Sequence, residues 1–391
     1  PAPVAWWIRS TSMAVIACAV LACLGAIAPV TDDDALAYVV PIARHIAETG
    51  QVRVWTDQAR SMWPQSQQVL LAYLLNTGSE RLGALTAFEW LLCLGAVSAL
   101  ARRVCERREH VGAALIIAFG APVLAFQVSS AKEDLLLVAA SAATAFCLAG
   151  GGDHVEYAAA GLFAGIAAGA KYPGLGIALA AVAWPLVCTS SVALPLPPTR
   201  RRRWHGAALV AVCAAASGGL WYGLNLWRYG NPVAPFGWGA PGTPLDAGVI
   251  GEFMDGYGAG RDPLAFLLAP VRIFLEPSRF CGRANLYNPL AYAGLAGLFA
   301  SRTRHRHAPL FFMAAVLYVG WFLTLQNARL LLPVAVLLAP AAADHLVPLI
   351  RRWRALTVLA CGVTVVSLGV VAAVGVVRAG RYMHDAPGFL E

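Results

Sequence analysis

The residues best suited to chemistry are three consecutive aspartates, Asp32, Asp33 and Asp34, directly after a long apolar run. That run, residues 10–30, is long enough to cross a bilayer as a helix. Adjacent carboxylates repel one another and are costly near hydrocarbon, so they must face water, a cation or a polar substrate. Capping of a following helix alone is one explanation, but a cap needs a single aspartate. The triplet therefore favours a catalytic or metal-binding role for at least one member.

Other candidate residues stand beside the ends of expected helices. Glu133 and Asp134 could carry acid–base chemistry or could simply cap a helix. Lys171 and Arg329 could bind a phosphate or could anchor the protein to lipid headgroups. Arg228, among aromatic residues, leaves the same two interpretations open.

The composition is that of a protein with many transmembrane helices. Of its 391 residues, 59% are hydrophobic and 13% are charged, and the mean hydropathy is +0.64. The formal net charge of +8 could suggest nucleic-acid binding, but the arginines cluster between apolar runs, which is typical of membrane topology. The nine cysteines form no CxxC pair, which argues against a disulfide framework and a zinc site.

Apolar runs near 20 residues predict about eleven spans and an all-α, polytopic fold. One transmembrane domain covers residues 1–391, and no separate soluble domain is expected. Glu89 and Asp344 are the acids within spans, and such residues are by default functional, although water could solvate Asp344 near its helix end. The expected spans are an uncleaved first helix at 10–30, then 80–101, 111–128, 135–150, 155–171, 173–190, 206–226, 287–300, 308–325, 330–349 and 355–377.

Basic turns set the expected orientation. Arginines cluster at 102–108, 200–203, 302–306 and 351–354, and the positive-inside rule makes all these turns cytoplasmic. The N-terminus is then cytoplasmic and Asp34 lies outside.

Two expected outer segments, 31–79 and 227–286, are long. Within them, residues 35–48 predict an amphipathic helix in the membrane interface, and residues 262–276 a second interfacial element. The Gly- and Pro-rich residues 237–260 predict a mobile loop.

The order of these features resembles the GT-C glycosyltransferases, membrane enzymes that use polyprenyl-phosphate-linked sugars. Protein O-mannosyltransferases and the aminoarabinose transferase of lipid A belong to this group. The stretch from Asp34 through Tyr38 is similar to an Asp-x-x-x-Tyr-x-x-Pro motif of uncharacterised bacterial GT-C-like proteins, although Val39 stands where they often have histidine. The other similar stretches lie at 131–134, 161–173, 230–236 and 326–333, so the resemblance covers about residues 10–335.

This resemblance implies an enzyme that transfers a sugar from a polyprenyl-phosphate-linked donor to a lipid, glycan or protein acceptor at the outer face of the membrane. It implies Asp34 as the general base and Asp134 as an assisting acid, with Asp33 as a further catalytic candidate. The residues that it assigns to substrate binding are Glu133, Tyr38, Lys171, Tyr172, Arg228 and Arg329.

The resemblance has further implications for the lipid and for a cofactor. Gly161 and Gly165 would leave room between helices for the lipid tail. Some relatives use a divalent cation, so Mg²⁺ or Mn²⁺ could bridge Asp34 and Asp134, while other relatives need none.

The expected location is the bacterial inner membrane of the cell envelope, with the active site on the periplasmic face. Membrane lipids are expected partners, and nucleic acid is not. The alternative function is a secondary transporter or flippase of a lipid-linked sugar, which Glu89 within a span supports. The concentration of acids at the outer rim favours the enzyme, and a non-catalytic scaffold would not need them.

Overall fold

The computed structural model describes residues 32–52, 55, 59–79, 81–128, 130–150, 153–187, 199–282, 287–299 and 304–353, with scattered residues in 9–30 and 362–373. Among these residues there are helices and turns and no β-strand, which confirms the all-α prediction. The expected first and last spans lie largely outside the described residues.

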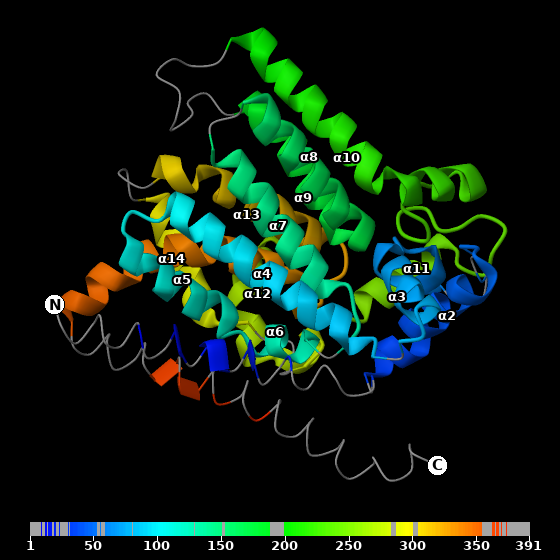
Figure 1. The fold of residues 1–391 in the computed structure, drawn as a ribbon, viewed down its shortest axis with the longest axis horizontal. Helices are drawn as coiled ribbons and strands as arrows, with labels where there is room; N and C mark the ends of the chain where they lie inside the picture. Colours follow the sequence, from blue (N-terminus) through cyan, green and yellow to red (C-terminus); the bar gives the residue numbers. More distant parts are fainter. Residues whose placement is uncertain are drawn as a thin grey trace.

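Figure 1 shows the helices of the described part, coloured along the chain. Their bounds are η1 Ala35–Val39, α2 Val40–Thr49, η2 Ala59–Met62, α3 Ser66–Asn76, α4 Gly83–Val104, α5 Arg108–Phe119, α6 Pro122–Gln127, α7 Asp134–Leu148, α8 His154–Ala170, α9 Pro173–Val187, α10 Arg200–Tyr229, α11 Ala247–Asp255, α12 Pro263–Leu275, η3 Pro277–Phe280, η5 Pro289–Leu298, α13 Arg304–Leu323, η6 Ala328–Leu331 and α14 Leu332–Arg352.

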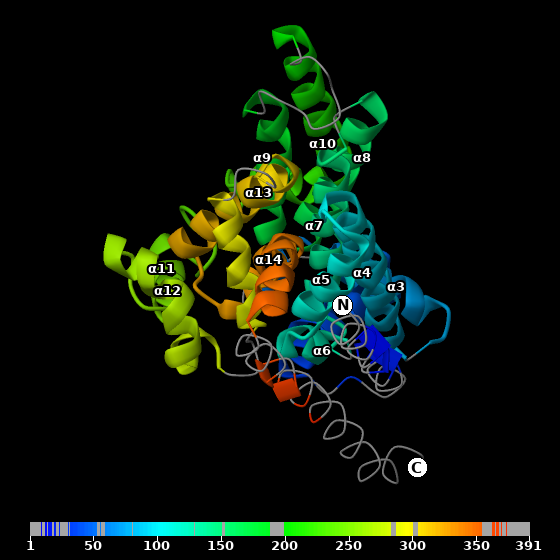
Figure 2. The same ribbon diagram turned by 90° about the vertical axis from the view of Figure 1, so that its left-hand side faces the viewer.

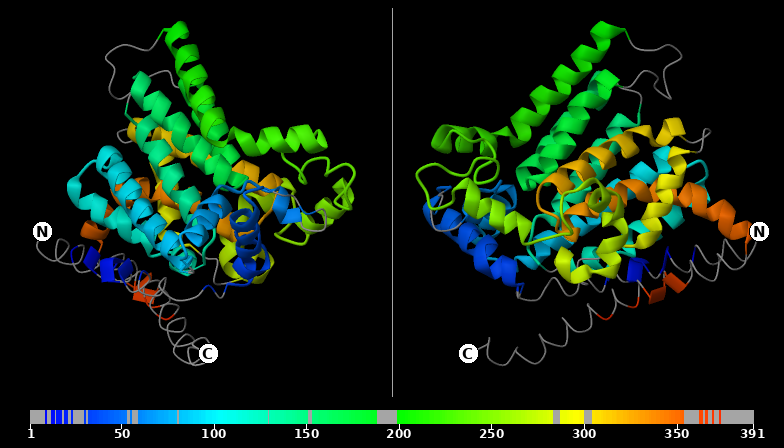
Figure 3. Two further views of the ribbon diagram at one scale, coloured as in Figure 1. Left: turned by 45° about the vertical axis from the view of Figure 1, so that its right-hand side comes forward. Right: turned by 180° about the vertical axis from the view of Figure 1, so that it is seen from behind.

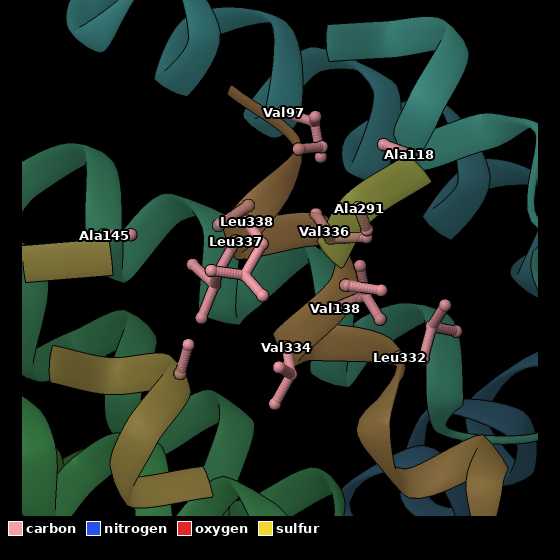
Figure 4. Close-up of a cluster of buried hydrophobic side chains, with 14 of the residues drawn as sticks. Val97, Ala118, Val138, Ala145, Ala291, Leu332, Val334, Val336, Leu337 and Leu338 are labelled. Atoms are coloured by element: carbon pink, nitrogen blue, oxygen red, sulfur yellow. The ribbon is translucent and has the colours of Figure 1, made fainter. Parts of the chain in front are cut away.

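Helix α14 forms the centre of the molecule. Figure 2 shows it between α13 and α5, and it also packs on η5 and α7. Its apolar side chains, among them Val334 and Val336, gather with Val138 of α7 and Ala291 of η5 (Figure 4). The rest of the protein buries 89% of the most apolar stretch of this helix, so the helix packs against other helices rather than against lipid. The short helix η6, which carries Arg329, directly precedes α14.

Helices α8 and α10 lie side by side, as Figure 1 and Figure 3 both show, and small residues allow them to approach closely. A Cβ atom added to Gly165 would lie 2.3 Å from the carbonyl oxygen of Ala214, and one added to Gly161 would lie 2.5 Å from that of Val210. The expectation that these glycines open a groove for lipid is therefore wrong, because the backbone of α10 occupies the space beside them.

Four described helices are long and apolar enough to cross a membrane: Gly83–Val104, Arg200–Tyr229, His305–Leu323 and Ala328–Arg352. Shorter apolar helices are Asp134–Leu148, Pro173–Val187, Pro263–Leu275 and Pro289–Leu298. The polytopic architecture is confirmed, while the number of eleven spans remains a prediction.

Three predicted elements differ from the structure. The span at 111–128 is divided into α5, which ends at Phe119 with Gly120 as its C-cap, and α6, which begins at Pro122, because proline lacks the amide hydrogen that would continue α5. The span at 287–300 contains a 3₁₀-helix of ten residues, which rises about 20 Å and is too short to cross. The expected loop at 237–260 contains α11, whose start is capped by the Asp246 side chain.

In the half of α14 away from Arg329, Asp344 is buried rather than solvated. It accepts hydrogen bonds from the amide of Glu106 at 3.0 and 3.1 Å, and its carboxylate lies 2.5 Å from Nδ1 of His110. Nearby, Glu109 pairs with Arg351 at 2.6 Å. The basic turn at 102–108 and the last turn of α14, which carries Arg351, therefore meet at one end of the bundle.

Candidate active site

At the opposite end, charged residues from four distant parts of the chain converge. Asp34 stands at the start of η1, Asp134 at the start of α7, Lys171 at the end of α8, and Arg329 in η6. Each side chain is fixed by a helix end, and the packing of the helices brings these ends together. These four residues, which sequence analysis proposed for the site, thus form one cluster.

The three aspartates of the triplet have different environments. Oδ1 of Asp32 accepts from the amide of Ala35 at 3.2 Å, so Asp32 caps the helix, and it also pairs with Lys132 at 2.9 Å. Asp33 is exposed and forms no ion pair with any described residue. Asp34 turns toward the cluster and receives a hydrogen bond from Nη1 of Arg329 at 3.1 Å.

Arg329 lies between the two candidate catalytic acids. Its Nη1 contacts Oδ2 of Asp34 at 3.1 Å, and its Nε lies 3.7 Å from Oδ2 of Asp134. Its side chain is 13% exposed, whereas that of Asp34 is 32% exposed. One guanidinium therefore links a buried acid with an acid that remains accessible.

Lys171 holds the second acidic pair. Its ammonium lies 2.9 Å from Oε1 of Glu133 and 3.0 Å from Oδ1 of Asp134, and all three side chains are buried. A buried ammonium is stable only with such compensation, so this triad is a fixed part of the fold. The second oxygens of both acids, Oε2 of Glu133 and Oδ2 of Asp134, have no hydrogen-bond partner.

Two cations that sequence analysis did not assign complete the cluster. Lys132 lies 3.7 Å from Oδ2 of Asp34 in addition to its contact with Asp32. Arg60 of η2 lies over the ring of Tyr38 at 4.8 Å and reaches Oδ1 of Asp34 at 4.0 Å. With a side chain that is 39% exposed, Arg60 is the most accessible of these cations. Lys132 could have been suspected from its place beside two acids, but nothing in the sequence around Arg60 points to this site.

The cations and burial set the charge states of the cluster. Burial alone would raise the pKa of Asp34, but the positive charges of Arg329, Lys132 and Arg60 outweigh it and hold the pKa below its usual value. Burial, followed by repulsion from Arg329, lowers the pKa of Lys132. Burial and the nearby charges of Glu133 and Asp34 hold the pKa of Tyr38 well above its usual range, so its hydroxyl stays protonated.

Tyr172 and Arg228 lie outside this cluster. The hydroxyl of Tyr172 donates to the carbonyl oxygen of Ala234 at 2.5 Å and lies 3.3 Å from that of Met62. Asn225 donates to the same Met62 oxygen at 2.8 Å. Tyr172 therefore fixes the turn that carries η2 and Arg60. Arg228 is exposed, and no described contact joins it to the acids.

The described acids do not fit a bridging divalent cation. Arg329 occupies the space between Asp34 and Asp134, and Lys171 already compensates Asp134. A metal ion there would have to displace a guanidinium, and no group of three or more His, Cys, Asp or Glu suited to a metal occurs among the described residues.

Comparisons with known proteins bear on the fold. Residues 11–149, which include the triplet, Lys132 and Asp134, match the DUF1420 N-terminal domain. No curated protein matches the chain.

Among solved structures, ArnT from Cupriavidus metallidurans bound to undecaprenyl phosphate is 16% identical with a TM-score of 0.59, over 96% of this chain and 75% of that one. Its apo state gives 16% identity and 0.56, over 95% and 74%. The Archaeoglobus fulgidus oligosaccharyltransferase in its apo form is 14% identical with a TM-score of 0.57, over 92% of this chain and 56% of that chain. Both proteins are GT-C glycosyltransferases, and the chain described here has the GT-C fold.

Proposed function

We propose that this protein transfers a sugar from a polyprenyl-phosphate-linked donor to an acceptor hydroxyl or amine, with Asp34 as the general base. The observation that carries the proposal is the junction of an accessible carboxylate, Asp34, with the cations Arg329 and Arg60 in one cluster. ArnT, which shares the fold, has been seen with undecaprenyl phosphate, and that supports a lipid-phosphate donor here.

The reaction needs two kinds of group, and the cluster has both. Asp34 would take the proton from the acceptor as the acceptor atom bonds to the anomeric carbon. The bond from that carbon to the phosphate oxygen breaks, and the polyprenyl phosphate leaves with the electron pair. Arg60 and Arg329 would stabilise the negative charge of this leaving group.

Arg329 also couples the two events. While it pairs with Asp34, it keeps that carboxylate ionised but weakly basic, because it holds the pKa low. A donor phosphate that competes for the guanidinium would weaken this pair and raise the basicity of Asp34. Arrival of the donor would thereby activate the base when it is needed.

We assign the cluster to the outer face because the basic turns gather at the opposite end of the bundle, where Arg351 pairs with Glu109 and Arg103 pairs with Glu156. Labelling of single cysteines in intact cells with an impermeant reagent tests the orientation. A cysteine at position 202 should stay unlabelled until the membrane is permeabilised, and its labelling in intact cells would reverse the orientation.

The activity is tested with purified protein and undecaprenyl-phosphate-linked monosaccharides in the presence of membrane extract as the acceptor source. Release of undecaprenyl phosphate by the wild type and not by Asp34→Asn is the expected result. The same protein in liposomes should not move the donor between leaflets. Donor movement without release of undecaprenyl phosphate would replace the enzyme with the flippase alternative.

A further inference from the structure

A second set of polar side chains, below called the polar cluster, is buried in α3, α4 and α6, and Glu89 among them interacts with the charges of Glu133 and Asp134. Its members are Glu89 of α4, Gln67 and Gln68 of α3, and Gln127 of α6, with relative exposures of 1%, 0%, 3% and 0%. Glu89 stands six residues after the first residue of α4, which places it about 9 Å along the helix. A carboxyl group and several amides at this depth need a reason, because burial of polar groups without partners is costly.

These side chains are not satisfied by one another. Gln67 lies close to the Glu89 carboxyl group. Even so, both oxygens of Glu89 and both terminal atoms of Gln67 have no hydrogen-bond partner of good geometry among the described residues. Oε1 of Gln68 and Nε2 of Gln127 also have no partner. A buried polar group left without a partner destabilises the folded protein, because it has lost its hydrogen bonds to water. These buried donors and acceptors therefore remain available to form hydrogen bonds with a ligand.

The cluster continues directly from the active-site acids. Glu89 is close enough to Glu133 and Asp134 to interact with their charges. One turn before Glu89, the hydroxyl of Thr86 donates to the carbonyl oxygen of Val128 at 2.5 Å, which holds α4 against the segment that follows Gln127. The unpartnered oxygens of Glu133 and Asp134 extend the same series of polar atoms toward Lys171 and Arg329.

The carboxyl and amide groups of the cluster indicate which kind of ligand it can bind. Three neighbouring carboxyl groups repel a phosphate, and no described ion pair supplies Glu89 with a cation. Amide and carboxyl groups together offer donors and acceptors in several directions, which matches hydroxyl groups on a ring, since each hydroxyl both donates and accepts. The phosphate-binding cations and the hydroxyl-binding groups then lie at neighbouring parts of one site.

We propose that Glu89, Gln67 and Gln127 bind the hydroxyl groups of the sugar that the donor carries. This inference rests on the proposed function, because it takes the lipid phosphate to be held by Arg60 and Arg329. It assigns to α3 and α4 the recognition of the sugar, while the outer cations recognise the phosphate. Glu89 then explains a buried acid that the base and the leaving group do not require.

The test compares binding of two ligands to the full-length protein in detergent. One is bare undecaprenyl phosphate, and the other is undecaprenyl phosphate linked to mannose, glucose or N-acetylglucosamine, whichever the wild type binds most tightly. Glu89→Gln keeps the size of the side chain, and Gln67→Met removes the hydrogen-bonding groups of a side chain on a different helix. Ser141→Ala is the matched control, because its hydroxyl is buried in α7 and, among the described residues, donates to the carbonyl oxygen of Leu137 of the same helix at 2.7 Å. Thermal denaturation of each variant verifies that it is folded.

The expected result is a loss of about 10- to 100-fold in affinity for the sugar-linked donor in Glu89→Gln and Gln67→Met, with affinity for the bare carrier unchanged. Ser141→Ala should match the wild type for both ligands. Unchanged affinity for the sugar-linked donor, or an equal loss for both ligands, overturns the inference and leaves the proposed function standing. So does a wild type that binds no sugar-linked donor more tightly than the carrier. A wild type that fails to bind undecaprenyl phosphate removes the proposed function and the inference together.

Discussion

The three adjacent aspartates should respond differently to the same substitution, because the fold gives each a different environment. Asp34→Asn removes the proposed base while Asp32 continues to cap the helix. Loss of a general base typically slows a reaction by about 10²–10⁴-fold, equivalent to about 2.7–5.5 kcal/mol in the barrier. The stability cost should be small, about 1 kcal/mol or less, because Asp34 is partly exposed and Arg329 keeps its contact with Asp134.

Asp32→Asn should show the reverse pattern. Asparagine caps a helix as well as aspartate does, so the cap survives. The ion pair with Lys132 is lost, and the described acid that remains near this ammonium, whose side chain is 2% exposed, is Asp34 at 3.7 Å. Removal of one partner from a buried pair costs about 3–5 kcal/mol of stability. Asp33 is exposed, so Asp33→Asn should change stability by about 0.5 kcal/mol or less and leave transfer intact.

The assay measures release of undecaprenyl phosphate from a sugar-linked donor, alongside thermal denaturation of each purified variant. Near-normal release by Asp34→Asn would refute the assignment of the base. Equal inactivity of folded Asp33→Asn and Asp34→Asn would also refute it, because a general effect of charge in this segment would then explain both. Restored activity is not expected from Asp34→Glu, since the added methylene displaces the carboxylate from Arg329.

Three further predictions follow from the same contacts. Since the pKa of Asp34 is lowered in the folded protein, its ion pairs should stabilise fully above a pH of about 4 and be lost only as pH falls through that lowered value; Arg329→Gln should move the acid limb of the transfer rate to higher pH, and an unmoved limb would show that another group sets it. Transfer should persist in excess EDTA because Arg329 stands between the acids, and its abolition with rescue by Mg²⁺ or Mn²⁺ would contradict this. Asp344→Ala should lower the melting temperature at a cost of about 1–3 kcal/mol for each buried donor left unpaired, such as His110, without changing the donor affinity of the folded protein, and unaltered melting would remove the structural role of Asp344.

Much of the helical architecture follows from the sequence alone. Long apolar runs must form helices in a membrane, since every backbone hydrogen bond has to be satisfied within the segment. The expected spans at 80–101 and 330–349 correspond to α4 and α14 for this reason. The same local logic failed where backbone geometry, rather than hydropathy, decides the outcome. Pro122 divides one expected span, and residues 289–298 adopt a 3₁₀-helix.

The sequence also placed several charged residues at helix ends, where Asp34, Asp134, Lys171 and Arg329 are found. Their partners could not be inferred, because an ion pair between residues 34 and 329 depends on how η1 lies against η6. The three adjacent aspartates are identical in sequence, but the fold gives them different partners, which the sequence alone does not show. The amide of Ala35 and the ammonium of Lys132 select Asp32, and the guanidinium of Arg329 selects Asp34.

Tertiary structure alone decided which polar residues belong to the site and which merely support it. Tyr172 fixes a turn through backbone oxygens, while Arg60, with no sequence motif around it, reaches Asp34. Glu89 could be recognised from sequence as an acid within a span, but not as a neighbour of Gln67 on another helix. Hydropathy depends on a residue and its immediate neighbours, so it determines which segments enter the membrane. Charge pairing and buried hydrogen-bonding capacity depend on distances between helices, and only the packed bundle sets those distances.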